Sequence, residues 1–318
     1  MTNSKLDLLN LLVLESDNYS NLHDLEKLAE TPAVLKSMPI QPLYLAVKRA
    51  GADQVALILP HLAKEQKEAL LDLDLWHRDA MDTISFAFWP KAYVMCKDLE
   101  VIGDFASSDQ FLLYLKSVCH LYTFDAEDPQ YPDHDDYFLT DDTLVLIEYG
   151  EEYDLGKELR YLIKNLYGKL GPTDAYKLLF KIISEPHMLF TEELYQEKKS
   201  RLRDFGFVDY YDALELKANF SDLGAINYFI KTKECATGAL DDDQKNQKLH
   251  SSSIISFKTG MESIHNELSK LQDQKRTDFL QFNFVRLVNA TMALENSLKS
   301  GAIAMNRVGK ASKQLIEL

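Results

Sequence analysis

The stretch that decides the fold is PLYLAVKRAGADQVALILPHLAKEQKEALLDLDLW, residues 42–76. Its apolar residues recur every three or four positions, so each short segment has one apolar stripe of the kind that packs a helix against its neighbours. Pro42 suits the first turn of a helix, Gly51 suits a left-handed stop after it, and Pro60 separates the two segments that follow. Because helices this short are not stable alone, the pattern predicts a stacked array of short helices.

Capping residues divide much of the remaining chain into further helices. Ser108 is expected to cap the helix DQFLLYLKSVC, and Asp209 the helix YYDALELK. Pro172 is expected to open DAYKLLFKII, and Thr191 to open EELYQEKKSRLRDFG. Helix is therefore expected to dominate on both sides of a short region of different composition.

That region is 121–149, LYTFDAEDPQYPDHDDYFLTDDTLVLIEY, where helical spacing is lost. It contains two β-prone runs separated by residues rich in Asp and Pro. In the run from Thr143 to Glu148, successive side chains would point to opposite faces of a strand. Near its middle both faces carry apolar residues, which is typical of a strand buried on two faces. Strand content is expected to be confined almost entirely to 120–150.

The C-terminal part of the chain contains long helices. From Thr277 to Lys299, leucines and other apolar residues follow alternating steps of four and three, the spacing of helix-on-helix packing. Further apolar residues widen this stripe, so we expect the helix to pack against two neighbours, at 251–271 and 301–317. The alternative is self-association through the same face.

The predicted fold is mainly α, with stacked short helices in a superhelical array, one small β-hairpin sheet around 120–150 and a C-terminal helical bundle. The predicted organisation is a helical array at 1–120, the β insertion at 121–150, a second helical region at 151–237, a polar linker at 238–252 and long helices at 253–318.

Composition limits the possible partners. Lys plus Arg less Asp plus Glu is 35 − 50 = −15, an excess that repels nucleic acid and anionic lipid at long range. We therefore expect a basic or neutral protein partner, no nucleic acid and no membrane span, because no run of about 18 apolar residues occurs. The apolar N-terminal run contains Asp7 and Asn10 and is interpreted as a helix, not a signal peptide.

The three cysteines, Cys96, Cys119 and Cys235, are far apart and have no paired spacing. A disulfide scaffold or structural zinc site would need several at short spacing. Reduced thiols and a cytoplasmic location are expected.

One candidate site is the segment from Asp72 to Asp82. Read as chemistry, Asp74, His77 and Asp79 could form a metal or acid–base site. Read as structure, Asp82 caps the next helix, Asp79 pairs with Arg78 or Arg49, and Trp76 anchors the core with its N–H bonded locally. We favour the structural interpretation.

Four aromatic or histidine side chains are candidate contacts for a partner protein. They are Trp76, His77, Tyr210 and Tyr211. Aromatic residues in an acidic surface suit protein recognition, although at helical spacing they more often belong to a core.

The acidic loop between the β-prone runs is the second candidate site. Clustered carboxylates can bind a hard cation, and Asp133, Asp135 and Asp136 are the weak metal candidates. The EF-hand pattern is interrupted by prolines and lacks its central glycine, so a solvated acidic loop is favoured. No nucleotide-binding glycine loop or G-x-S-x-G motif occurs, so we expect no cofactor and assign no catalytic residue.

Three stretches resemble a bacterial family of uncharacterised proteins, a domain of unknown function. They are LLDLDLWHRDAMD at 70–82, YFLTDDTLVLIEY at 137–149 and RLRDFGFVDYYDALELK at 201–217. This resemblance implies a shared fold and carries no catalytic residues. Residues 43–74 also resemble the helical N-terminal domain of MgtE-type magnesium transporters through a rhythm of leucines and acids.

The function expected from these observations is that of a cytoplasmic protein-interaction or scaffold protein without catalytic activity, with no oligomeric state assigned. The alternatives are a divalent-cation-responsive regulatory domain and an enzyme whose site is not readable from the sequence. A bound metal at the acidic loop would favour the first alternative, and a deep pocket with converging titratable groups the second.

Overall fold

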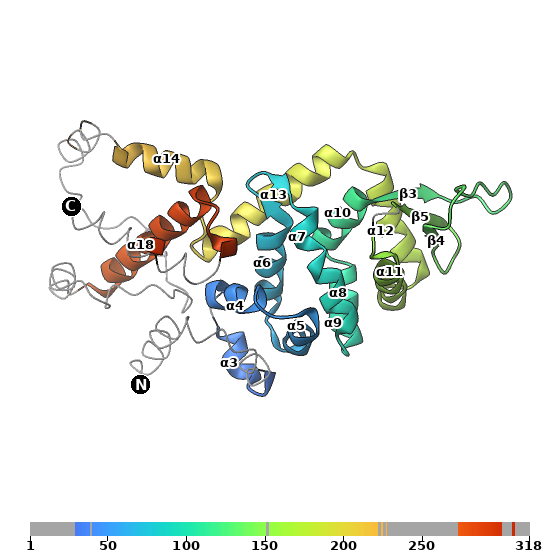
Figure 1. Cartoon of the computed structure of the whole chain (residues 1–318), viewed down its shortest axis with the longest axis horizontal. Helices are drawn as coiled ribbons and strands as arrows, with labels where there is room; N and C mark the ends of the chain where they lie inside the picture. The colour runs from blue at the N-terminus through green and yellow to red at the C-terminus, as the bar shows by residue number, and fades with distance from the viewer. Residues whose placement is uncertain are drawn as a thin grey trace. The chain divides into compact units, whose positions relative to one another are not determined.

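The computed structural model describes residues 29–38, 40–150, 153–221, 224, 227, 273–300, 307 and 308 (Figure 1). These residues are mainly helical, which confirms the predicted fold class. No helix in the described ranges is long and apolar enough to cross a membrane. The expected linker at 238–252 lies outside them.

The chain divides into two compact units that do not follow chain order. The sheet unit holds described residues 29–36, 50–150 and 153–198, and the C-terminal unit holds 37, 38, 40–49, 199–221, 224, 227, 273–300, 307 and 308. The border falls inside helix α13 (His187–Asp204).

The helices of the sheet unit are short, as the punctuation predicts. They are α3 (Pro32–Lys36), α5 (Ala52–Ile58), the 3-10 turn η2 (Leu59–His61), α6 (Lys64–Leu75), α7 (Thr83–Phe86), α8 (Phe88–Met95), α9 (Leu99–Ala106), α10 (Asp109–Val118), α11 (Gly156–Leu170) and α12 (Pro172–Ser184). Helix α8 packs on α5, α9 and α11, and α11 packs in turn on α9 and α12. Successive helices therefore support one another through shared neighbours.

Several helix ends lie where the sequence places them. The Asp82 carboxylate accepts a hydrogen bond from Ser85 N at 2.9 Å, and Ser108 Oγ accepts one from Phe111 N at 3.3 Å. Pro172 opens α12 directly after Gly171, whose φ is 77°. These outcomes confirm the predicted caps of α7 and α10 and the start of α12.

Two helix ends were predicted wrongly. Gly51 has φ −73° and precedes α5, with its N–H donated to Gln54 Oε1 at 3.1 Å, so it is not a left-handed stop. Thr191 lies inside α13 and donates to His187 O at 2.7 Å. Helix α13 begins earlier because Pro186 O already accepts from the N–H of Phe190, which leaves Thr191 in the next turn.

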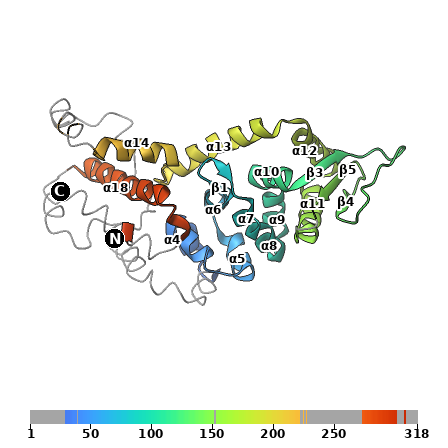
Figure 2. The same ribbon diagram turned by 45° about the horizontal axis from the view of Figure 1, so that its top comes forward.

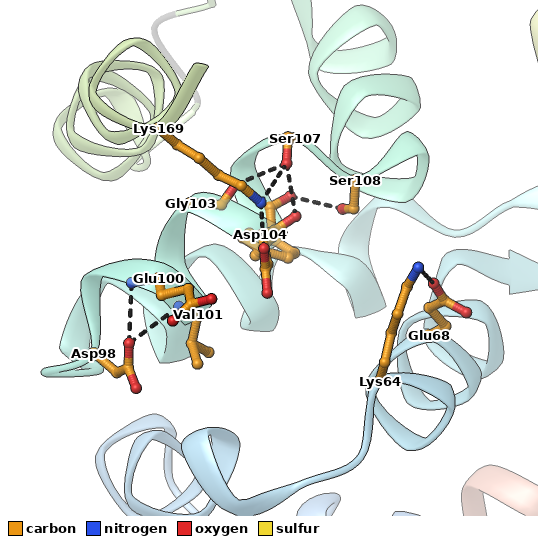
Figure 3. Close-up of polar contacts among 11 residues, drawn as sticks. Lys64, Glu68, Asp98, Glu100, Val101, Gly103, Asp104, Ser107, Ser108 and Lys169 are labelled. Atoms are coloured by element: carbon orange, nitrogen blue, oxygen red, sulfur yellow. Dashed lines mark hydrogen bonds and ion pairs between the residues drawn. The ribbon is translucent and has the colours of Figure 1, made fainter. Parts of the chain in front are cut away.

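Helices α9 and α11 are joined by polar contacts over a close backbone approach (Figure 3). Lys169 Nζ on α11 pairs with Asp104 and lies 3.3 Å from Ser107 Oγ. The stem of Lys169 crosses directly over Gly103, where an added Cβ would lie 2.9 Å from Lys169 Cδ. Only glycine fits beneath this side chain without a shift. A second pair in this view, Lys64 with Glu68 at 3.6 Å, lies on the surface of α6.

The core of the sheet unit is aromatic. Tyr93 and Phe105 stack with ring centroids 3.9 Å apart, and Phe86 and Phe111 contact the same Phe105 ring. Burial raises the pKa of Tyr93 far above its ordinary value, so its hydroxyl stays neutral.

The sheet unit contains a three-stranded antiparallel sheet in the predicted region. Its strands are β3 (Cys119–Thr123), β4 (Tyr137–Leu139) and β5 (Val145–Tyr149), in the order β3–β5–β4. The central strand β5 is buried through Val145, Leu146 and Ile147, which confirms a strand with two apolar faces.

A second sheet has two strands of two residues each, β1 (Trp76–His77) and β2 (Ala80–Met81), and was not predicted. The turn between them places Arg78 at φ 60°. Strands this short show no alternation, so their sequence gave no β signal.

The C-terminal unit contains α4 (Ile40–Val47), α14 (Tyr210–Ser221), α18 (Gln274–Leu294) and the turn η3 (Leu298–Ser300). Helix α18 packs on α14, and the two run side by side in the turned view (Figure 2). Val288 and Met292 of α18 are buried, as a core helix requires. The expected neighbours at 251–271 and 301–317 fall almost entirely outside the described residues.

Helix α18 ends earlier than predicted. It stops at Leu294, where Asn296 takes a left-handed φ of 50° and Ser297 N–H reaches back to Met292 O at 2.9 Å. This C-terminal closure separates Leu298 from the helix that was predicted to include it.

Candidate protein-interaction surface

Trp76 lies in the core, 4% exposed, with its ring centroid 5.3 Å from that of Tyr195. Lys198 Nζ lies 5.9 Å from the Trp76 ring centroid and 3.2 Å from Arg78 O, closing the β1–β2 turn. The predicted local hydrogen bond is wrong, because Trp76 Nε1 has no partner among the described residues.

The neighbouring acidic residues of this segment do not converge. Asp74 is fully buried and its carboxyl group accepts from Trp89 Nε1 at 2.9 Å, whereas Asp79 is exposed beyond the half-buried His77. In the described part of the chain, no group of three or more His, Cys, Asp or Glu side chains is placed to hold a metal.

Tyr210 and Tyr211 begin α14, with ring centroids 5.5 Å apart in an edge-to-face arrangement. Tyr211 is 51% exposed. Lys199 Nζ lies 3.8 Å from carboxylate oxygens of Asp209 and Asp212, so charge around the pair is partly neutralised.

A serine and a histidine that sequence reasoning did not pair meet on the sheet unit. Ser117 Oγ lies 2.9 Å from His187 Nε2, and Thr191 Oγ1 lies 3.3 Å from His187 Nδ1. The two residues are 70 apart in the chain, so no local pattern announces the contact.

This serine is poorly placed to act as a nucleophile. Ser117 occupies the last turn of α10 and its hydroxyl also lies 2.7 Å from Leu113 O. The nearby Cys119 N–H is bonded to Leu115 O, and a helix C-terminus carries partial negative charge, which disfavours an oxyanion there. We therefore interpret the contact between Ser117 and His187 as a structural hydrogen bond that joins α10 to α13.

The sheet presents one face with exposed aromatic and acidic side chains. Paired residues share a face, and the register aligns His120, Glu148 and Tyr137 in one row and Tyr122, Leu146 and Leu139 in the next. We call this side the outer face; the opposite side carries the buried Phe138, Val145 and Ile147. In both views, the strands and the loop from β3 to β4 project from the helices of their unit (Figures 1 and 2).

The loop at 124–136 extends the outer face with aromatic rings of its own. Tyr131 lies 5.2 Å from Phe124 and 5.9 Å from Tyr137, measured between ring centroids. Tyr131 is 51% exposed and Tyr122 48%. The outer face therefore carries a run of touching rings that remain half open to solvent.

His134 fixes the loop to the sheet. Its Nε2 lies 2.9 Å from Glu148 Oε1, and its Nδ1 accepts from Asp136 N–H at 3.1 Å. Desolvation, followed by the nearby Glu148 charge, raises the pKa of Tyr122. The metal candidates Asp133 and Asp135 are exposed on either side of this histidine.

The charge of this region is one-sided. Residues 117–156 contain no Lys or Arg and twelve acidic residues: Asp125, Glu127, Asp128, Asp133, Asp135, Asp136, Asp141, Asp142, Glu148, Glu151, Glu152 and Asp154. The whole chain has a formal charge of −15, so most of its excess lies in this segment.

The hairpin beneath the face is firmly anchored. Asp142 Oδ1 accepts from Thr140 Oγ1 at 2.7 Å, Leu144 N at 3.1 Å and the Tyr167 hydroxyl at 3.2 Å. Burial, with the nearby Asp142 charge, raises the pKa of Tyr167 to about 12. Asp142 therefore ties the β4–β5 turn to α11 and is a structural residue.

Comparison with known proteins gives a family but no characterised relative. No curated protein and no solved structure matches the chain, so the resemblance of 43–74 to magnesium transporters gains no support. The predicted membership of an uncharacterised family is confirmed. The match covers residues 11–318, and the chain belongs to the family of unknown function DUF6178.

Proposed function

We propose that this chain is a cytoplasmic protein-interaction or scaffold protein without catalytic activity. The observation that carries the proposal is the outer face, where Tyr122 on strand β3 and Tyr131 on the adjoining loop are half exposed. Aromatic side chains of this kind are enriched at the centres of protein interfaces, because they offer large apolar area at low entropic cost.

The other chemical groups of the described chain support this preference. The buried carboxyl groups of Asp72 and Asp74 accept hydrogen bonds from Gln110 and Trp89, which are structural roles. Cys96 and Cys119 are free and buried, which suits a reducing compartment.

The test is quantitative affinity capture from the native cell with wild-type chain and the double variant Tyr122→Ser, Tyr131→Ser. The control is Tyr161→Ser, since Tyr161 is a 38% exposed aromatic residue on helix α11 and not on a strand of the sheet. We expect at least one protein to be lost from the double variant and retained by the control. Equal capture by all three chains would remove the outer face from the proposal.

The cation-responsive alternative is distinguished by calorimetric titration of the full chain with Ca²⁺ and Mg²⁺. Loosely organised carboxylate sites bind no tighter than about millimolar, and this is the expected limit here. Micromolar binding that is lost on Asp133→Asn with Asp135→Asn would replace the proposed function with the regulatory one.

A further inference from the structure

We propose that the outer face binds an arginine- and lysine-rich segment of another protein, with cationic side chains lying over the exposed tyrosine rings and pairing with the loop carboxylates. This proposal rests on the proposed function and adds the chemistry of the partner.

The first support is charge that the chain itself leaves uncompensated. Asp128, Asp133 and Asp135 are exposed, and none has an ion-pair partner within the described residues. From 117 to 156 the chain has no Lys or Arg, so this segment supplies no permanently cationic side chain to neutralise them. A cationic partner segment would supply the missing charge and relieve the repulsion among these carboxylates.

The second support is the combination of rings with carboxylates. A guanidinium or ammonium group is attracted to the face of an aromatic ring and to carboxylate oxygens at the same time. Tyr122 and Tyr131 expose ring surface, while Asp133 and Asp135 lie in the same loop as Tyr131. An apolar partner would use the rings but would gain nothing from the acids around them.

The arrangement also favours a peptide over a metal ion. The contact between His134 and Glu148 holds this part of the loop, and Asp133 and Asp135 flank it as exposed carboxylates. The described residues contain no group of ligands converging on one point. Charges distributed along a surface match a chain of cations better than one ion.

The test uses the full chain and three labelled twelve-residue peptides, in which Ser alternates with Arg, with Lys or with Glu. Binding is followed by fluorescence anisotropy at low and high salt. We expect the Arg peptide to bind most tightly, the Lys peptide more weakly and the Glu peptide not at all. Screening should weaken Arg-peptide binding about tenfold or more as the Debye length falls from about 10 Å to about 3 Å.

Two double variants separate the contributions. Asp133→Asn with Asp135→Asn, and Tyr122→Ser with Tyr131→Ser, should each weaken Arg-peptide binding about tenfold, roughly 1.4 kcal/mol. The matched control is Glu65→Gln with Glu100→Gln, which removes the same charge from exposed positions on α6 and α9 and should change binding less than twofold.

The outcomes that overturn the proposal are distinct. Equal weakening by the Glu65/Glu100 control would show attraction by net charge alone, and insensitivity to both outer-face double variants would place binding elsewhere. Light scattering that shows a dimer lost on Tyr122→Ser with Tyr131→Ser would make a second copy the occupant. If affinity capture depends on the tyrosines while the peptides fail to bind, the proposed function survives and the basic partner does not.

Discussion

The chain's two tryptophans offer a matched test of how its core is held together. Trp76 and Trp89 both lie in the sheet unit and are 4% and 1% exposed. Trp89 Nε1 donates to Asp74 Oδ2 at 2.9 Å, whereas Trp76 Nε1 has no partner among the described residues. Replacing either tryptophan by Phe removes a similar ring volume. The effect on hydrogen bonding is opposite, because only Trp89 loses a hydrogen bond.

Trp89→Phe removes the hydrogen bond from Trp89 Nε1 to the fully buried Asp74 carboxyl group, and the loss of one such bond costs about 1 kcal/mol. Trp76→Phe removes a buried N–H that has no partner among the described residues, and with it a desolvation penalty of about 1–3 kcal/mol. The loss of ring volume is common to both and largely cancels. We therefore expect Trp89→Phe to be less stable than Trp76→Phe by about 2 kcal/mol or more.

Urea unfolding gives the comparison directly. Each variant keeps one tryptophan, so its fluorescence reports the unfolding of the same sheet unit, and far-ultraviolet circular dichroism checks that both start folded. Equal stabilities, or a Trp76→Phe variant that is the less stable of the two, would refute the reasoning. That result would mean that Trp76 N–H has a strong partner in solution.

Three further predictions test other contacts. Gly103→Ala should lower the free energy of unfolding by about 1 kcal/mol, because its Cβ would meet Lys169. Gly168→Ala, which has open space inside α11, should raise it by about 0.5–1 kcal/mol; equal gains at both sites in thermal unfolding would show that Lys169 moves aside. Tyr167→Phe should flatten the loss of stability above pH 10. Because the pKa of Tyr167 is about 12 in the folded state and near 10 in the unfolded state, its contribution to stability is full below pH 10 and is lost as pH rises through 12. An unchanged slope of urea midpoints against pH would contradict this. Asn289→Ala should lower the free energy of unfolding by about 2 kcal/mol, because it removes the buried hydrogen bonds of Asn289 to the Gln41 side chain and to Gly206 O. A decrease of less than about 0.5 kcal/mol in urea unfolding would argue against these two hydrogen bonds.

The sequence predicted those features that depend on neighbouring residues. Ser108 caps α10 because its hydroxyl accepts an N–H only three residues away. The alternation from Thr143 to Glu148 predicted β5, because the side-chain period of a strand is visible within six residues. Gly51 and Thr191 were misassigned because the same residue types serve at starts, ends and interiors of helices, and the choice depends on where the preceding turn closes.

The sequence could not predict which buried polar groups meet. Trp76 was expected to be buried, and it is, but whether its N–H finds a partner depends on residues brought in by packing. Asp74 accepts a hydrogen bond from Trp89, 15 residues away, and Asn289 donates to Gly206 O, 83 residues away. No local pattern encodes such distances, because they follow from how helices stack.

The contacts that build the outer face also could not be predicted from the sequence, and they bear on function. From the sequence, Asp133, Asp135 and Asp136 were weighed as ligands by residue type alone. The structure adds that Tyr131 packs beside Phe124 and Tyr137, and that His134 attaches the loop to Glu148. The loop carboxylates repel one another, and the segment from 117 to 156 carries no Lys or Arg to offset this repulsion. A surface that keeps rings open to water and carboxylates unneutralised on a firmly anchored hairpin is more stable once a cationic segment covers it, and this is why the partner's charge, before its identity, is the property to test.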